Sequence, residues 1–216
     1  MNQRYANAVL GQRIIELCCE LFSIRVPEVY YIYQRRGDFK LMDSSFQIIS
    51  YDRRSIDLNE NKIYFDYKRY EMYINMDIFV NKIPSLTVIL RKMRELYQIS
   101  QIQKLRKNQK TDENQRIVKQ WRHAYMMSNK KRYAAEPPIE LDKNAFAKYI
   151  VYCLFDIEIK FKVVSLQTFR EHLHRIEMKY NPIELVDLAE KHKIETKVAK
   201  YFNMEDFQIE ILSSRH

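Results

Sequence analysis

Apolar residues recur three and four positions apart over most of this chain, a spacing that is typical of amphipathic helices. It predicts a first helix over residues 3–22, ending before Pro27, and a long helix from Pro84 through Tyr97 with one apolar and one basic face. A further helix is predicted over residues 111–127. After the proline pair at 137–138, helices are predicted at residues 139–155, 165–180 and 182–193, with a short last one at 196–202.

Between the first two helices the pattern changes to short runs rich in β-branched and aromatic residues. These runs predict strands at residues 29–33, 46–50, 62–67 and 72–74, with a turn signal at 35–38. The predicted fold class is therefore α+β, mostly helical, with a small antiparallel or mixed sheet and helices at the C-terminal end.

Composition sets limits on the class of protein. With 216 residues, 46% of them hydrophobic, we expect one domain, or one domain plus an appendage. The three cysteines, Cys18, Cys19 and Cys153, show no disulfide-framework spacing, which indicates reduced thiols in a cytoplasmic protein. The sequence shows no signal-peptide pattern and no apolar run near the ~20 residues of a membrane span, so no membrane partner is expected.

The excess positive charge is confined to one segment. The formal net charge is +9, yet residues 91–132 hold thirteen lysines and arginines against three acids, a local charge of +10. The remaining residues carry twenty-four basic and twenty-five acidic side chains, a charge of −1. The basic residues that we assign to polyanion binding are Lys104, Arg106, Lys107, Lys110, Arg116, Lys119, Arg122, Lys130, Lys131 and Arg132.

A basic segment of this kind attracts polyanions, and Trp121, Tyr125 and Tyr133 are interleaved with its cations as candidates for stacking on bases. The predicted partner is nucleic acid or a nucleoprotein complex. No helix-turn-helix, zinc-finger or RNA-binding signature indicates sequence-specific recognition. The alternative is a solvated basic loop between two helices, kept charged for solubility.

Two segments about forty-five residues apart carry a family resemblance. Residues 90–98 read Leu-Arg-Lys-Met-Arg-Glu-Leu-Tyr-Gln, and residues 138–147 read Pro-Ile-Glu-Leu-Asp-Lys-Asn-Ala-Phe-Ala. This pair resembles the active-site segments of minimal zinc metallopeptidase-like proteins of the SprT and ImmA/IrrE type. There the first helix carries His-Glu-x-x-His, often as His-Glu-Leu-Arg-His-x-Tyr-Gln, and a later helix carries Glu-x-Asp-Ala-Asn-Ala-Phe-Ala.

The resemblance covers residues 1–160 and implies a zincin-like domain whose small sheet lies beside the former active-site helix. Residues 161–216 have no counterpart and form a predicted helical appendage, suited to a protein partner. Within the second segment, Lys143 is the one departure, since the family has Ala in the Asp-Ala-Asn sequence.

The residues that carry the chemistry are missing from the resemblance. Arg91, Lys92 and Glu95 stand where the first His, the Glu and the second His belong. A guanidinium has no acceptor for a metal, and a lysine cannot replace the carboxylate base. We therefore predict no catalytic residue, no metal and no cofactor. Arg91 is predicted to fill the volume of the lost metal and to pair with Glu95 and Glu140, beside Asp142; the alternative is that Arg91 and Glu95 are solvated.

The leading hypothesis is a non-catalytic binding protein on a pseudo-metallopeptidase scaffold, contacting nucleic acid or a nucleic-acid-handling protein complex. By analogy, such proteins occur among phage and mobile-element genes, where inhibition of a host or defence enzyme is a common role. One alternative is a divalent-metal-dependent hydrolase that uses Glu95, Glu140 and Asp142. The other is a structural or assembly protein whose basic charge is incidental.

Overall fold

The computed structural model describes residues 3–35, 38–50, 63–128, 137–163 and 165–197, and it is mostly helical with one small mixed sheet, which confirms the α+β prediction. The α-helices are α1 (Gln3–Leu21), α2 (Lys82–Arg106), α3 (Gln115–Ser128), α4 (Pro138–Phe155), α5 (Leu166–Lys179) and α6 (Pro182–Lys191). The strands are β1 (Glu28–Arg35), β2 (Asp38–Met42), β3 (Ile48–Ser50), β4 (Ile63–Asp66) and β5 (Glu71–Asn75), followed by the 3-10 helix η1 (Met76–Val80).

The sheet has the order β3-β2-β1-β5-β4. Only β1 and β5 run parallel, with Tyr30 opposite Tyr73, and the other neighbours are antiparallel. The sequence pattern missed β2, because its polar residues Asp38 and Lys40 interrupt the apolar run. The predicted strand at 46–50 begins later, because Asp43 accepts backbone hydrogen bonds in the turn that precedes it.

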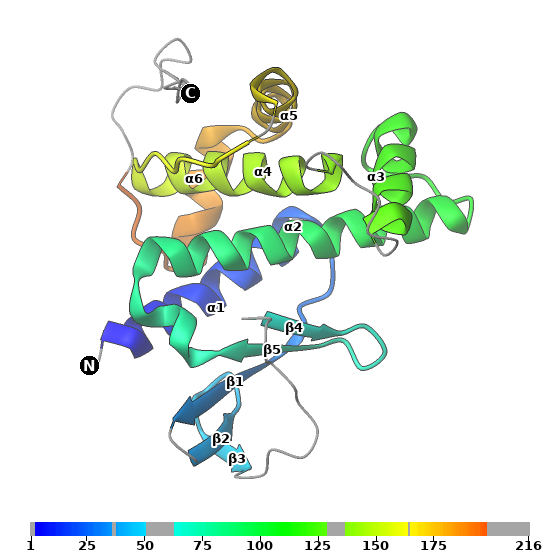
Figure 1. Ribbon diagram of the computed structural model, residues 1–216. Coiled ribbons are helices and arrows are strands. Elements are labelled where there is room, and N and C mark those ends of the chain that lie inside the picture. The colour runs from blue at the N-terminus through cyan, green and yellow to red at the C-terminus, as the bar shows by residue number, and fades with distance from the viewer. Residues whose placement is uncertain (1–2, 36–37, 51–62, 129–136, 164, 198–216) are drawn as a thin grey trace, which may run out of the picture.

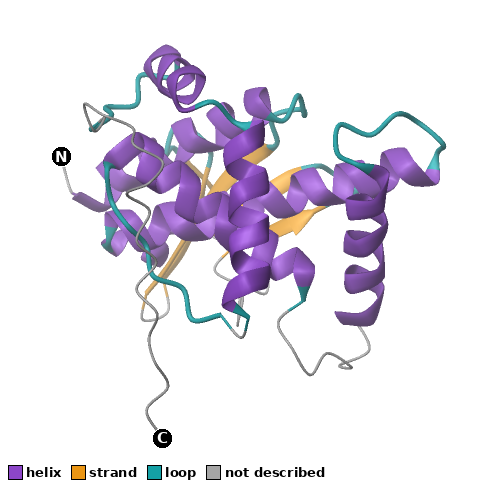
Figure 2. Ribbon diagram, turned by 90° about the horizontal axis from the view of Figure 1, so that it is seen from above, coloured by secondary structure: helices purple, strands orange, loops and turns teal. Residues whose placement is uncertain are grey.

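The elements form layers (Figure 1). Helices α1 and α2 lie over one face of the sheet, α4 lies on the other side of α2, and α5 and α6 pack on α4. Gly11 lets α1 approach α2 and η1 closely. A Cβ at this position would lie only 2.7 Å from Ile89 Cδ1 on α2 and 2.8 Å from Phe79 Cε1 on η1. Seen from above, α3 stands at one side of the molecule, at the end of α2 (Figure 2).

Helix α4 is the central element of the core. Nearly all of its residues are buried, and Ala145 and Ala147 leave room for its neighbours. Phe146 packs against Phe22 and Tyr180, with ring centroids 5.1 and 5.8 Å apart. The segment that carries the family resemblance is therefore an interior helix, which explains its small and apolar residues.

The C-terminal helices share this core. Phe169, Leu173 and Ile176 of α5 and Leu185 of α6 belong to the same buried cluster as α4. The predicted boundary at residue 160 falls in the connection between α4 and α5, and the predicted helix at 196–202 lies largely outside the described residues. Within the described part of the chain, none of the helices combines the length and apolarity that a membrane crossing requires.

The three cysteines are free and buried, as predicted for reduced thiols. Burial raises the pKa of Cys153 to about 12, and burial together with Glu16 raises the pKa of Cys19 to about 12. Thiols with such pKa values are poor nucleophiles, so these side chains serve the core.

Candidate functional site

Helices α2 and α4 meet at the positions where the resemblance places a metal. Arg91, on α2, donates to Glu140 in the first turn of α4, with Nη2 and Oε2 3.1 Å apart. Lys92 pairs with Glu95 on the same helix, with Nζ and Oε1 2.8 Å apart. The predicted contact of Arg91 with Glu140 is thus present, whereas Glu95 draws its cations from Lys92 and from α4.

Lys143 is the cation that joins the two carboxylates. Its Nζ lies 2.5 Å from Glu140 Oε1 and 3.4 Å from Glu95 Oε2, and its side chain is 10% exposed. The structure therefore differs from the prediction that Arg91 takes this place, because Arg91 lies at the rim with its side chain 38% exposed. The signal was present in the sequence, since Lys143 is the one residue that departs from the family's Asp-Ala-Asn.

A second ion pair lies deeper, and sequence reasoning missed it. Arg94 is fully buried and holds Asp142 with two donors, Nε to Oδ2 at 2.8 Å and Nη2 to Oδ1 at 3.2 Å. Arg94 also donates to the Tyr180 hydroxyl at 2.9 Å and to Glu113 at 3.3 Å. A planar fork facing a carboxylate in this way fixes the spacing of two helices.

Asp142, on α4, gathers its partners from two other helices, α2 and α5. Arg175 on α5 donates to the same carboxylate, His172 Nδ1 lies 3.7 Å from Oδ1, and Gln98 donates to Oδ2 at 2.6 Å. Burial alone would raise the pKa of Asp142, but the charge of Arg94 and the hydrogen bonds around it hold this pKa well below its usual range. Asp142 is therefore ionised inside the core.

The same network fixes the loop that leads into α3. Lys179, at the end of α5, contacts Glu113 at 2.7 Å and the Tyr97 hydroxyl at 2.6 Å. Gln101 forms two hydrogen bonds with Asp112. Its side-chain oxygen accepts from the Asp112 N–H at 2.7 Å, and its side-chain amide donates to the Asp112 carboxylate at 2.8 Å. Residues 112 and 113 are therefore held against α2, so that α3 starts from a defined point.

The three acids of the hydrolase alternative, Glu95, Glu140 and Asp142, do not all face one site. Glu95 and Glu140 both pair with Lys143, while Asp142 pairs with Arg94 in the core. In the parts of the chain that the structure describes, no three His, Cys, Asp or Glu side chains are grouped so that they could hold a metal ion.

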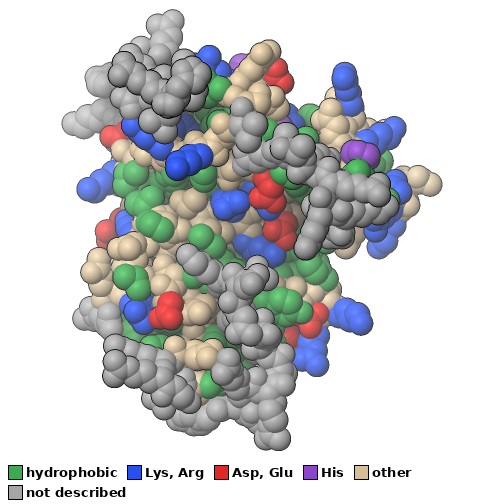
Figure 3. All heavy atoms as spheres, in the orientation of Figure 1, with side chains coloured by type: hydrophobic (Ala, Val, Ile, Leu, Met, Phe, Trp, Pro, Cys, Tyr) green, Lys and Arg blue, Asp and Glu red, His purple; other side chains and the backbone are tan. Residues whose placement is uncertain are grey.

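The basic segment divides into two sets of cations. Arg91 and Arg94 pair with carboxylates of α4, Lys92 pairs with Glu95 on α2 itself, and Lys104 pairs with Asp112 at 2.7 Å. The exposed set, here called the α3 basic surface, comprises Arg106, Lys107, Lys110, Arg116, Lys119 and Arg122. Blue side chains gather at the side of the molecule where α3 stands, whereas blue and red alternate between α2 and α4 (Figure 3). Lys130, Lys131 and Arg132 lie outside the described residues.

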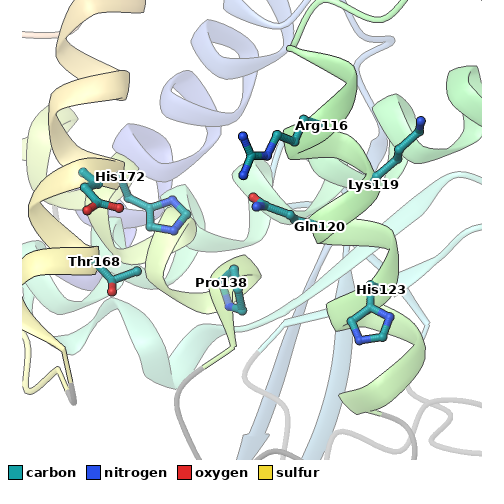
Figure 4. Close-up of a pocket in the computed structure, with 8 residues that line it drawn as sticks. Arg116, Lys119, Gln120, His123, Pro138, Thr168 and His172 are labelled. Carbon is teal, nitrogen blue, oxygen red and sulfur yellow. The ribbon is translucent and has the colours of Figure 1, made fainter.

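A hollow of about 640 Å³ lies between α3 and α5, beside the start of α4. Its lining residues are Arg116, Lys119, Gln120, His123, Pro138, Thr168, Glu171 and His172. Arg116 and Gln120 point from α3 toward His172 on α5, while Lys119 extends away from the gap at the rim (Figure 4). Four of these side chains are cationic or can become so, against a single acid, so the hollow favours an anionic group. The sequence pattern gave no reason to place His123 and His172 in one hollow, since only the packing of α3 and α5 on α4 brings them together.

The three stacking candidates have different outcomes. Trp121 is fully buried, packed within 5.4 Å of the Arg94 guanidinium and 5.6 Å of that of Arg175, so its assignment as a surface for bases is wrong. Val118 and Ala124, three residues to either side, are buried with it, a helical spacing that could have shown this. Tyr125 is 37% exposed and remains a candidate, and Tyr133 lies outside the described residues.

Comparison of the chain with protein-family models, with curated proteins and with solved structures finds no match.

Proposed function

We propose that the protein is a non-catalytic binding protein that contacts nucleic acid, or a nucleic-acid-handling protein complex, through the α3 basic surface. The observation that carries this proposal is that, within the described residues, none of the six side chains of that surface has a carboxylate partner. Cations that have no acidic neighbour are available to neutralise phosphates, and release of the condensed counterions drives such binding.

The arrangement of the cations favours a backbone contact over base recognition. Arg116, Lys119 and Arg122 follow one another at intervals of three along an exposed stripe of α3. Arg106 at the end of α2, and Lys107 and Lys110 in the loop before α3, are exposed as well. An extended stripe of this kind matches a charged backbone, which is independent of sequence. The 640 Å³ hollow adjoins the stripe through Arg116 and Lys119.

The site between α2 and α4 supports a scaffold without catalysis. If the resemblance to zinc metallopeptidases reflects descent, Lys143 has replaced the metal as the positive charge between Glu95 and Glu140. An ammonium at that point keeps the two helices together through charge-assisted contacts, as a metal would. It excludes a second cation by repulsion, and this disfavours the hydrolase alternative.

A protein partner has a separate candidate surface. Met178 and Ile183, at the junction of α5 and α6, are 69% and 71% exposed. These two apolar side chains agree with the predicted role of the C-terminal helices in protein contacts. Substitutions at Met178 and Ile183 leave every cation of the α3 basic surface in place, so the two surfaces can be tested separately.

Charge reversal on α3 tests the proposal. In a variant with Arg116→Glu, Lys119→Glu and Arg122→Glu, we expect binding to a fluorescent oligonucleotide to be lost at moderate salt. At low salt, the slope of log K against log[salt] should fall by about 0.7–0.9 for each lost phosphate contact, so by about two in total. Fluorescence anisotropy over a salt series, with heparin as competitor, measures both quantities.

A matched control separates local from global charge. Lys162→Glu, Arg170→Glu and Lys193→Glu change the net charge equally at exposed positions outside the α3 basic surface. This variant should keep most of the affinity. Equal losses in both variants, or unchanged affinity in the α3 variant, would refute the α3 basic surface as the binding site and favour the assembly-protein alternative.

A further inference from the structure

A small aromatic pocket lies on the other side of α3 from the 640 Å³ hollow. Its volume is about 170 Å³, and its lining residues are Tyr67, Ile99, Ile102, Gln103, Arg106 and Tyr125. Tyr67 comes from the turn between β4 and β5, which projects below the end of α2 in Figure 1, whereas Tyr125 comes from α3. The β4–β5 turn, α2 and α3 thus converge on one pocket.

The two tyrosines are exposed although they have apolar rings. Tyr67 is 43% exposed and Tyr125 is 37% exposed, whereas most of the other aromatic side chains near α2 are in the core. Rings that remain open to solvent at the walls of a pocket offer faces to a planar ligand. Burial, Glu95 and the neighbouring Tyr125 all raise the pKa of Tyr67, which agrees with the closeness of the two phenols.

Tyr67 is held in place before any ligand arrives. Its hydroxyl donates to Glu95 at 3.3 Å, and Glu95 is fixed in turn by Lys92 and Lys143. Its ring packs edge-on against Phe65, with centroids 4.8 Å apart. The ion pairs between α2 and α4 therefore position one wall of the pocket, which lowers the entropy lost on binding.

We propose that this pocket binds one unpaired nucleobase, with Tyr67 and Tyr125 as its aromatic walls, so that the protein prefers single-stranded nucleic acid. The inference deepens the proposed function and rests on it. Ile99 and Ile102 supply an apolar floor, and the Gln103 amide can pair with the edge of a base. Arg106 belongs to both the pocket and the α3 basic surface, so one nucleotide can place its base in the pocket and its phosphate on that surface.

The size of the pocket selects a single ring system. Sites for whole small molecules begin at about 300 Å³, well above 170 Å³. A base in a duplex is already stacked and paired, and it would have to leave the helix before it could enter. A single strand presents its bases freely, and aromatic side chains bind them with little dependence on sequence.

The test uses a short single-stranded oligonucleotide with one central 2-aminopurine, whose fluorescence falls when it stacks, and the same sequence as a duplex. The wild-type protein should quench the single strand and bind it more tightly than the duplex. Tyr125→Ala should abolish the quenching and weaken single-strand binding about tenfold, while duplex binding stays unchanged. Tyr125→Phe and Tyr67→Phe keep the rings and should keep the quenching.

Tyr64→Ala serves as the control, because Tyr64 is equally exposed at 43% but packs toward Tyr73 on the sheet, with centroids 6.1 Å apart. It should leave both measurements unchanged. Running the series with DNA and with RNA shows which sugar the protein accepts. Unchanged quenching in Tyr125→Ala, or equal affinity of the wild type for single strand and duplex, would overturn the pocket. If charge reversal on α3 still abolishes binding in that case, the proposed function survives without it; no binding to any oligonucleotide would end both.

Discussion

At the scale of single residues, two arginines of α2 form ion pairs of different kinds with α4. The pair between Arg94 and Asp142 has no exposed side-chain surface on either partner, whereas Arg91 and Glu140 are about one-third exposed. Charges removed from water depend on their partner for compensation, while exposed charges are solvated with or without one. Arg94 and Arg91, which look alike in the basic segment, should therefore differ widely in their effect on stability.

Replacing Asp142 by Asn should be among the most destabilising conservative changes in this chain. It keeps the shape of the side chain but leaves the buried charge of Arg94 with only the longer contact to Glu113, 3.3 Å, at a cost of about 3–5 kcal/mol. The matched variant Glu140→Gln should cost at most about 1 kcal/mol, because its pair is partly solvated. Urea unfolding at neutral pH measures both. A similar loss of unfolding free energy in the two variants would show that burial does not determine the cost of removing the carboxylate charge.

The difference in unfolding free energy between the wild type and Asp142→Asn should depend on pH, because the pKa of Asp142 is lowered in the folded protein. In the unfolded chain this carboxyl has a pKa of about 3.9. Its contribution to stability is fully present above that value and is lost as the pH falls toward the lower pKa of the folded state. The gap in unfolding free energy between wild type and Asp142→Asn should thus be constant from pH 7 to pH 5 and narrow by about 1 kcal/mol at pH 3. A gap that does not change down to pH 3 would contradict this assignment.

At the scale of elements, the fold depends on close approach of α1 to α2 and η1. Gly11→Leu should destabilise the protein by about 1–3 kcal/mol, because its side chain would enter space that Ile89 and Phe79 occupy. Gly11→Ala should cost less, since the higher helix propensity of Ala, about 1 kcal/mol, offsets part of the clash. Thermal unfolding followed by circular dichroism measures both. A Leu variant as stable as wild type would show that the interface can open without loss.

Much at this scale could be predicted from the sequence, because periodic apolar residues define helices directly. The helices after Pro84 begin and end within a few residues of their predicted bounds, apart from the long continuation of α2 to Arg106 and the start of α3 at Gln115. Asn114 explains the second difference, since its side chain accepts from the N–H of Arg116 and so caps α3 there. Capping competes with periodicity at helix ends.

The candidate site was predictable only in part. The facing of α2 and α4 followed from the family resemblance, and the exposed cations of α3 from the charge pattern. The role of Arg94 did not follow, because one arginine among thirteen basic residues looks like surface, although it lies between Leu90 and Tyr97 on the apolar face. The pairing of Tyr67 with Tyr125 has no local signal at all, since tertiary packing alone joins the β4–β5 turn to α3.

At the scale of the whole molecule, the excess charge is sorted by depth. The cations nearest the middle of α2 pair with carboxylates of α2 and α4, and among the described residues those without a carboxylate partner lie toward α3. The paired cations stabilise the contact of α2 with α4, whereas the exposed cations toward α3 are available to bind a ligand. As a result, Arg91, Glu95 and Lys143 can be substituted while the cations of the α3 basic surface stay in place.

That separation allows a direct test of the scaffold. In a variant with Arg91→His, Glu95→His and Lys143→Ala, two imidazoles lie at i and i+4 on α2, facing Glu140 without the intervening ammonium. Two histidines and one glutamate form a known ligand set for zinc, so we expect near-stoichiometric zinc by elemental mass spectrometry and a higher unfolding temperature with zinc than with a chelator. The wild type should retain little zinc and unfold at the same temperature in both conditions.

Adding Glu140→Gln to that variant should weaken zinc binding, because the third ligand loses its charge. Duplex binding through the α3 basic surface should remain as in the wild type, because none of these substitutions removes a cation of that surface. A triple variant that folds but takes up no more zinc than the wild type would show that α2 and α4 do not meet as in a metallopeptidase. Zinc uptake would instead show that a few side chains separate this ion-paired core from a metal centre. In that case Lys143 occupies, between Glu95 and Glu140, the place that a metal takes in the variant.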